Sequence, residues 1–143
     1  MNIIEVAVEE FSQIYPLIKE LRPHLEFTDF ELLFNQAKLR DEYRIVGIRQ
    51  NNHYIAIMGY RILFDFVHGK HLYINDLVVT DSVRSQGFGQ QLLYFAELEA
   101  KKHQCQGIRL STGVENKRAM SFYEKNHWSQ RAVVYKKKLE AFK

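Results

Sequence analysis

Apolar and polar residues recur along the chain with two periods, and the change between them predicts the order of secondary structure. Residues 2–8, NIIEVAV, are rich in β-branched side chains and predict a first strand. Over residues 9–22 the apolar side chains return every three or four positions, which predicts an amphipathic helix. Pro16 lies inside that range, where proline kinks or breaks a helix.

A second helix is predicted directly after the first. Thr28 and Glu31 have the spacing of a capping box, in which two side chains satisfy the unpaired N–H groups of a helix start. This spacing predicts a helix over residues 29–39.

Beyond these helices the apolar period shortens, and three strands are predicted in series. Residues 43–50 and 53–66 read as strands, and Asn51–Asn52 between them suit the positive φ angles of a tight hairpin turn. His68–Gly69 predicts a second turn, into a third strand over residues 71–79. Two short turns in succession make all three strands antiparallel.

The last third of the chain alternates helices with strands. After a glycine-containing stretch, residues 90–102 predict a helix that Gly107 ends, and residues 108–112 predict a strand. A further helix is predicted over residues 116–126. Residues 127–139, HWSQRAVVYKKKL, predict a final strand or tight hairpin.

These elements follow the order β-α-α-β-β-β-α-β-α-β, which predicts an α/β fold with a central mixed sheet flanked by helices. The strand–helix–strand unit around the glycines favours one parallel pair, because such crossovers join parallel strands. With 143 residues and no linker or repeat, the sequence predicts a single domain over residues 1–143.

Composition narrows the class of protein. A chain with 46% hydrophobic and 26% charged residues is typical of a soluble globular domain. No apolar run approaches the length of a membrane span, and the N-terminal residues lack the pattern of a secretion signal. One cysteine and no internal disulfide fit a reducing cytoplasm. The net charge of +3 is too small and too dispersed to predict nucleic-acid binding.

The stretch VRSQGFGQQLL places two glycines between a predicted strand and a predicted helix. A helix start preceded by glycine presents unpaired N–H groups and the positive end of the helix dipole, an arrangement that binds phosphates. Gly87 and Gly89 would let the backbone approach an anion, and Arg84 would add charge or fix the loop. The alternative is that the glycines serve only helix–sheet packing. Gln90–Gln91 do not match a P-loop, and Leu92 stands where a dinucleotide fingerprint has its third glycine.

Two motifs together carry a resemblance to a known family. Arg84, Gly87 and Gly89 match the pattern Arg/Gln-x-x-Gly-x-Gly/Ala, and residues 116–128, NKRAMSFYEKNHW, match Asn-x-x-Ala-x-x-Phe-Tyr-x-x-x-Gly-Phe. In both motifs, and in its order of elements, the chain resembles the GCN5-related N-acetyltransferases over nearly its whole length. His127 departs from the family's glycine, although histidine tolerates the positive φ of a helix end better than most residues.

This resemblance implies acetyl-coenzyme A as cosubstrate and a particular set of contacts. The backbone of the strand before the glycines would pair with the pantetheine amides, the loop's N–H groups would hold the pyrophosphate, and Asn116 would contact the coenzyme arm. The implied coenzyme-binding residues are Leu77, Val78, Val79, Arg84, Gln86, Gly87, Phe88, Gly89, Gln90 and Asn116.

The resemblance also implies the chemistry, in which a primary amine attacks the thioester directly in a ternary complex. Tyr123 would donate a proton to the departing thiolate as general acid. Asn75 falls where many relatives carry a glutamate and cannot accept a proton at neutral pH. Asp76 beside it is the candidate base, directly or through water; a purely structural carboxylate and proton removal by ordered water remain alternatives.

Other readings stay open. The chain could be a coenzyme-binding regulatory module without catalysis, or a transferase for a longer acyl group. Cys105 is interpreted as an incidental thiol, not an acyl-carrying nucleophile. The histidines lack metal-ligand spacing, so no metal is predicted, and His68 and His71 are interpreted as surface residues. The acceptor is a small-molecule or peptide amine that the sequence does not name, and a homodimer remains compatible with it.

Overall fold

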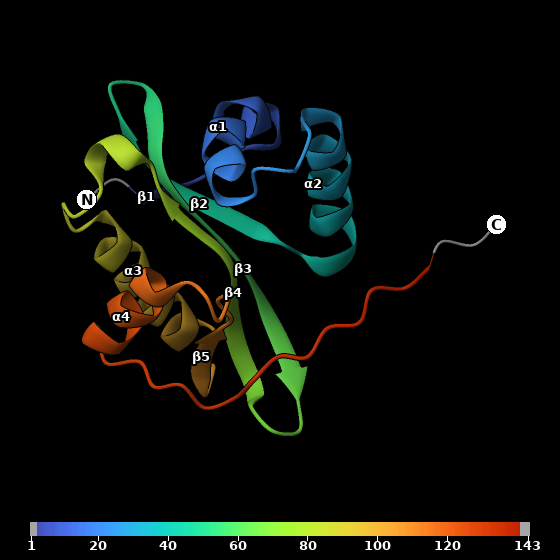
Figure 1. The fold of residues 1–143 in the computed structure, drawn as a ribbon, viewed down its shortest axis with the longest axis vertical. Helices are drawn as coiled ribbons and strands as arrows, with labels where there is room; N and C mark the ends of the chain where they lie inside the picture. Colours follow the sequence, from blue (N-terminus) through green and yellow to red (C-terminus); the bar gives the residue numbers. More distant parts are fainter. Residues whose placement is uncertain (1–2, 141–143) are drawn as a thin grey trace. The chain divides into compact units, whose positions relative to one another are not determined.

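The computed structural model describes residues 3–140. The chain divides into two compact units, one up to Leu110 and one from Ser111 onward. The first unit holds the whole β-sheet and three of the four α-helices that the described residues form. Figure 1 shows these elements in sequence order. Among the residues described, no helix is long and apolar enough to cross a membrane.

The sheet has five strands that follow one another in space as they do in sequence. Neighbouring strands from β1 to β4 are antiparallel, whereas β4 and β5 are parallel. The predicted mixed sheet is therefore confirmed, with its parallel pair where the crossover was expected. The strands are β1 (Ile3–Glu5), β2 (Arg44–Gln50), β3 (His53–Asp65), β4 (Gly69–Val79) and β5 (Gly107–Leu110).

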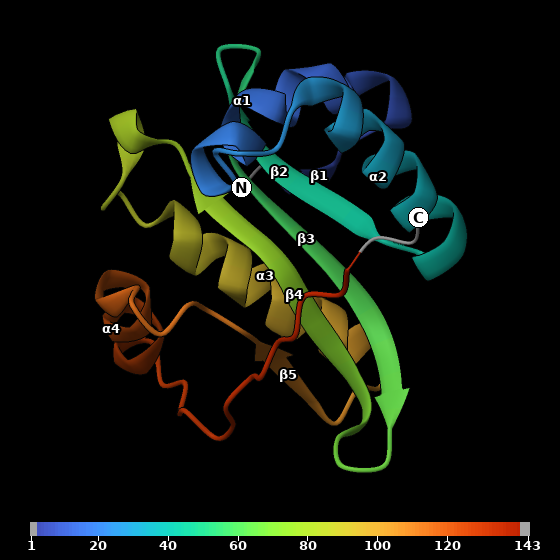
Figure 2. The same ribbon diagram turned by 45° about the vertical axis from the view of Figure 1, so that its right-hand side comes forward.

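Helices cover both faces of this sheet, with α1 and α2 on one side and α3 on the other (Figure 2). The helix predicted over residues 9–22 begins as a short 3₁₀ turn and continues through Pro16 without a break. The helical elements of the first unit are η1 (Val8–Glu10), α1 (Phe11–Leu21), α2 (Phe27–Asp41), η2 (Asp81–Val83) and α3 (Phe88–Lys102).

Two apolar layers hold the helices on the sheet. Under α1 and α2 the core contains Val6, which follows β1, and buried residues of both helices and of three strands: Ile14, Leu17, Ile18, Phe30, Phe34, Ile45, Tyr54, Ile57 and Val78. On the other face α3 buries Leu92, Leu93, Ala96 and Ala100. Burying one such leucine or isoleucine contributes about 1.5–3 kcal/mol, so these layers fix the position of both helix groups.

In the first unit, the observed turns agree with the predicted ones more closely than the observed helix ends agree with the predicted ends. Asn51 and Asn52 have φ angles of 51° and 66°, as predicted for the β2–β3 turn. The predicted capping box is wrong, because Glu26 is the N-cap of α2 and Thr28 lies inside its first turn without a capping hydrogen bond. Gly107 does not end α3, which stops at Lys102; this glycine begins β5 instead.

The second unit contains one helix, α4 (Lys117–Lys125), close to the predicted range. The predicted last strand is wrong for the residues that the structure describes, since residues 128–140 form neither a helix nor a strand. Their apolar side chains, Val133, Val134 and Tyr135, are exposed. A strand forms only when another strand accepts its hydrogen bonds, and an alternating pattern does not supply that partner.

Candidate active site

The turn before α3 has the geometry expected of an anion site. Gly87 is the N-cap of α3 with a φ of 88°, a conformation that residues with a Cβ rarely adopt. An α-helix supplies no acceptor for its first N–H groups, which here belong to Phe88, Gly89 and Gln90. The N-cap residue, Gly87, has no side chain that could accept hydrogen bonds from them. These N–H groups, at the positive end of the helix dipole, are therefore available to a negatively charged ligand.

Arg84 fixes the loop that leads to this turn. Its Nε donates to the backbone oxygen of Val79 at 3.2 Å, and its guanidinium forms an ion pair with Asp81. Glu20 of α1 holds the same segment from the other side, accepting from the Thr80 hydroxyl at 2.9 Å and from the Asp81 N–H at 3.1 Å. Arg84 thus holds the loop through contacts with its own neighbours in the chain. Gln86, beside Gly87, is exposed.

The end of β4 just before the loop keeps one edge without a strand partner in the first unit. β3 pairs with β4 as far as Val79, but β5 pairs only with residues 71–74 and ends at Leu110. Within residues 3–110, the segment Leu77–Val79 therefore has no strand partner on the side from which β5 has departed, although the Val79 oxygen accepts from Arg84 Nε. An extended ligand with amide groups can pair with such an edge as an added strand would.

A β-bulge lies at the point where β5 departs. Ile74 lies opposite Tyr60 and Asp76 lies opposite Gly59, so Asn75 is an extra residue in β4. The amide oxygen of Asn75 accepts from Arg61 Nε at 2.9 Å. Bulges redirect the side chains that follow them, and here the bulge turns Asp76 to the face that carries α1 and α2.

Asp76 is half-buried, and both of its carboxylate oxygens have partners. Oδ2 accepts a hydrogen bond from the Tyr43 hydroxyl, and Oδ1 accepts from Arg22 Nη2 at 3.3 Å. Burial, followed by the nearby Asp76 charge, raises the pKa of Tyr43 well above its usual value, so Tyr43 stays protonated and donates. The side chain of Arg22 is 54% exposed, which leaves its ion pair open to exchange with a ligand.

Tyr43 and Arg22 are site residues that the sequence reading missed. They lie 33 and 54 positions from Asp76, so no local spacing connects them to it. One signal was present, because Gly59 interrupts an otherwise apolar strand, and an isolated glycine there indicates close approach of another group. That group is the Tyr43 hydroxyl, which lies where a β-carbon of Gly59 would be.

Asn116 and Tyr123 belong to the second unit, and both are tied to α4. Asn116 is its N-cap, and its side-chain oxygen accepts from the Ala119 N–H at 3.1 Å. The Tyr123 ring packs beside Phe122 and Trp128, with centroid separations of 5.3 and 5.8 Å. Burial raises the pKa of Tyr123 to about 12, so the phenol holds its proton throughout the neutral range.

The structure also tests what the sequence predicted for His127, Cys105 and His71. His127 has a φ of 71°, the positive value expected at the position where the motif has glycine. Burial raises the pKa of the Cys105 thiol, which disfavours the thiolate that a nucleophile needs. The interpretation of His71 as a surface residue is wrong, because it is only 1% exposed.

A glycine turn at a helix start, beside a bulged strand that loses its neighbour, defines an α/β protein built to hold an anionic, amide-bearing ligand. Comparison with known proteins gives the class. The profile of the acetyltransferase (GNAT) family matches residues 5–128, and the chain belongs to this family of N-acetyltransferases.

Individual relatives agree with the assignment. The chain is 31% identical to the uncharacterized N-acetyltransferase YhdJ of Bacillus subtilis over 115 residues, 80% of this chain and 81% of that protein. It is 30% identical to the aminoalkylphosphonate N-acetyltransferase of Salmonella typhimurium over 129 residues, 87% of this chain and 82% of the relative. The aminoglycoside N-acetyltransferase AAC(6')-Iy, solved in complex with coenzyme A, shares the fold with a TM-score of 0.83 at 17% identity, covering 96% and 95% of the two chains.

Proposed function

We propose that the protein transfers an acetyl group from acetyl-coenzyme A to a primary amine, by direct attack within a ternary complex. The observation that carries the proposal is the start of α3, where Gly87 turns the chain so that three backbone N–H groups have no hydrogen-bond acceptor among residues 3–140. Family membership and a structural neighbour that binds coenzyme A support this choice of ligand.

The coenzyme would contact the end of β4, the start of α3 and Asn116. The pyrophosphate would accept hydrogen bonds from the N–H groups of Phe88, Gly89 and Gln90, and the pantetheine amides would pair with the open edge at Leu77–Val79. Arg84 would contribute mainly by holding the loop, since its guanidinium is already engaged with Val79 and Asp81. Asn116 would offer its amide N–H₂, because its oxygen caps α4.

The reaction needs a neutral amine, a base for its proton and an acid for the leaving thiolate. We place the amine at Asp76 Oδ1, where it would displace the exposed guanidinium of Arg22 and give up a proton to the carboxylate or to a water bound there. Nitrogen then attacks the thioester carbon, the C–N bond forms and the C–S bond breaks. Tyr123, protonated at neutral pH, would supply the proton that the sulfur takes.

A steady-state assay of thiol release tests the proposal. Acetyl-coenzyme A is offered with an aminoalkylphosphonate, an aminoglycoside, a polyamine, an amino acid and a lysine peptide, since the first two classes are named for relatives of this chain. The proposal expects saturable acetyl transfer to at least one class of amine. Coenzyme binding without transfer to any of them would favour a regulatory module, and faster transfer from longer acyl donors would correct the acyl group.

The remaining expectations follow the same proposal. The enzyme would work in the cytoplasm on a small-molecule or peptide amine, without nucleic acid or membrane, and acetyl transfer itself would use no metal. A homodimer is compatible with the proposed reaction, because every proposed contact comes from a single chain.

A further inference from the structure

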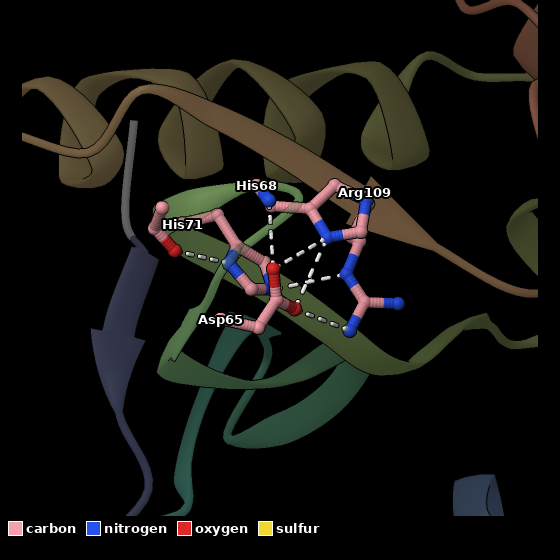
Figure 3. A network of polar contacts seen from close by, with 5 residues as sticks. Asp65, His68, His71 and Arg109 are labelled. Atoms are coloured by element: carbon pink, nitrogen blue, oxygen red, sulfur yellow. Dashed lines mark hydrogen bonds and ion pairs between the residues drawn. The ribbon is translucent and has the colours of Figure 1, made fainter.

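A compact group of polar side chains lies at the turn between β3 and β4, outside the proposed acetyl-transfer site. Asp65 ends β3, His68 lies in the turn, and His71 is the third residue of β4. Figure 3 shows that the three side chains converge, with Arg109 of β5 pointing toward them. The segment DFVHGKH thus brings one carboxylate and two imidazoles together from seven consecutive residues.

The ligand atoms are spaced for a shared ion. His68 Nδ1 lies 3.0 Å from Asp65 Oδ1, and His71 Nε2 lies 3.9 Å from Asp65 Oδ2. One ligand atom from each residue can be chosen so that all three fall within 4.8 Å of one another. Around a tetrahedral ion with bonds of about 2.0–2.2 Å, ligand atoms stand roughly 3.4 Å apart. Small rotations of the half-exposed Asp65 and His68 side chains would therefore close the site.

The tautomer of His71 suits metal binding. Its Nδ1 lies 3.0 Å from the Gly69 carbonyl oxygen, which can only accept, so Nδ1 carries the proton. The lone pair is then on Nε2, which faces Asp65. A histidine that donates its second N–H to a backbone carbonyl is the usual arrangement of a metal ligand, because this bond fixes the ring. His71 is almost fully buried, so the ring is held firmly.

Arg109 now supplies the positive charge that this group attracts. Its Nε donates to His71 Nε2 at 2.9 Å, and its Nη2 lies 3.8 Å from Asp65 Oδ2. The guanidinium carbon is also 4.5 Å from the centroid of the Tyr73 ring, which gives the cation a second favourable contact. An incoming metal ion would take His71 Nε2 from Arg109, and the guanidinium would remain over Tyr73.

A pocket beside the group provides access. It has a volume of about 220 Å³ and is lined by His68, His71, Arg109 and the adjoining residues Gln106, Gly107 and Ile108. This exceeds the space that one water molecule needs, so water ligands can complete the coordination sphere.

We infer that Asp65, His68 and His71 form a binding site for a divalent transition-metal ion such as Zn²⁺, in competition with the Arg109 side chain. Two imidazoles and one carboxylate favour this class over Mg²⁺ and Ca²⁺, which take oxygen ligands. The inference is independent of the proposed acetyl transfer.

Calorimetric titration of the tag-free protein with ZnCl₂, in buffer containing Mg²⁺, tests this inference. We expect one ion per chain, and His68→Gln or Asp65→Asn should weaken binding at least about tenfold. His24→Gln is the matched control, because His24 is exposed on the α1–α2 loop, and it should leave the affinity unchanged. Arg109→Met should tighten binding several-fold, since it removes the competing cation.

Circular dichroism first establishes that the variants are folded, and each binding result then supports or contradicts the inference. Equal affinity of the wild type, His68→Gln and Asp65→Asn would overturn the inference, as would the absence of any zinc-dependent heat. Weaker binding by Arg109→Met would overturn the competition and make Arg109 a support of the site. For the wild type, zinc-induced shifts of the His68 and His71 ring resonances in NMR spectra, without shifts at His24, would support it.

Discussion

The hydroxyl of Tyr43 occupies the space directly over the α-carbon of Gly59. A β-carbon built on Gly59 would lie 1.8 Å from the Tyr43 oxygen, far inside any allowed contact. Gly59 also lies opposite Asp76 in the β3–β4 pairing, and Tyr43 donates to that carboxylate. The missing side chain of Gly59 thus permits the hydrogen bond that orients Asp76.

Gly59→Ala should therefore displace Tyr43 and destabilise the protein by about 1–3 kcal/mol, the usual range for overpacking a filled site. Urea unfolding measures the change. Gly107→Ala is the matched control, because a β-carbon on that strand glycine meets nothing within 4 Å. If the two variants lost the same free energy, the contact between Tyr43 and Gly59 would not be the cause.

Asp76→Asn should lower kcat by about 10²–10³-fold if the carboxylate accepts the amine proton. Tyr43→Phe removes the hydrogen bond but keeps the carboxylate, so we expect a loss of less than about tenfold. Equal losses of kcat in the two variants would make Asp76 a structural residue of the bulge.

Tyr123→Phe should reduce kcat by about 10²–10⁴-fold with little change in coenzyme affinity, because only proton donation to the thiolate is lost. Burial raises the pKa of Tyr123 to about 12, and a general acid works below its pKa. The wild-type rate should thus show no alkaline decline from Tyr123 below about pH 10, the ordinary tyrosine value. Tyr94→Phe, at an exposed position of α3, is the control. An alkaline limb near neutrality that vanished in Tyr123→Phe would contradict the raised pKa.

Gly87→Ala should cost about 1–2 kcal/mol through the backbone alone, since its φ is 88° and a β-carbon would meet only Gln90 Oε1, at an ordinary contact distance of 3.9 Å. Thermal unfolding and coenzyme titration would both report the change, because a relaxed turn would also misdirect the N–H groups of α3. Ser85 adopts a φ of 68°, so Ser85→Gly tests the opposite direction and should not destabilise the loop. A fully stable Gly87→Ala variant would show that the turn tolerates a side chain.

Local chemistry made much of this fold predictable. Two asparagines were sufficient to place the β2–β3 turn, and the glycines marked the start of α3, because positive φ angles restrict the residues that fit. Helix ends were less predictable. Glu26 begins α2 although it makes no capping hydrogen bond, so packing of Phe30 and Phe34 against α1 outweighs the cap that Thr28 offered.

Contacts between segments that lie far apart in the chain could not be predicted from the sequence. His71 reads as part of a polar turn, but Arg109, 38 positions later, is brought beside it by the parallel pairing of β4 and β5. Tyr43 reaches Asp76 only because β3 lies between β2 and β4 with Gly59 at the crossing point. The alternating residues of the last segment predict a strand, but a strand also needs the edge of another strand to pair with. Residues 128–140 form no such pairing in the described part of the chain.

Calorimetric titration with acetyl-coenzyme A tests the central claim most directly, with coenzyme A and NADH as comparison ligands and Gly89→Val as the companion variant. We expect saturable binding of both coenzyme A forms, no binding of NADH, and loss of binding in a folded Gly89→Val protein, because a valine side chain would obstruct the pyrophosphate. Failure of the folded wild-type protein to bind either coenzyme form would contradict the account and assign the glycines of the turn to packing alone.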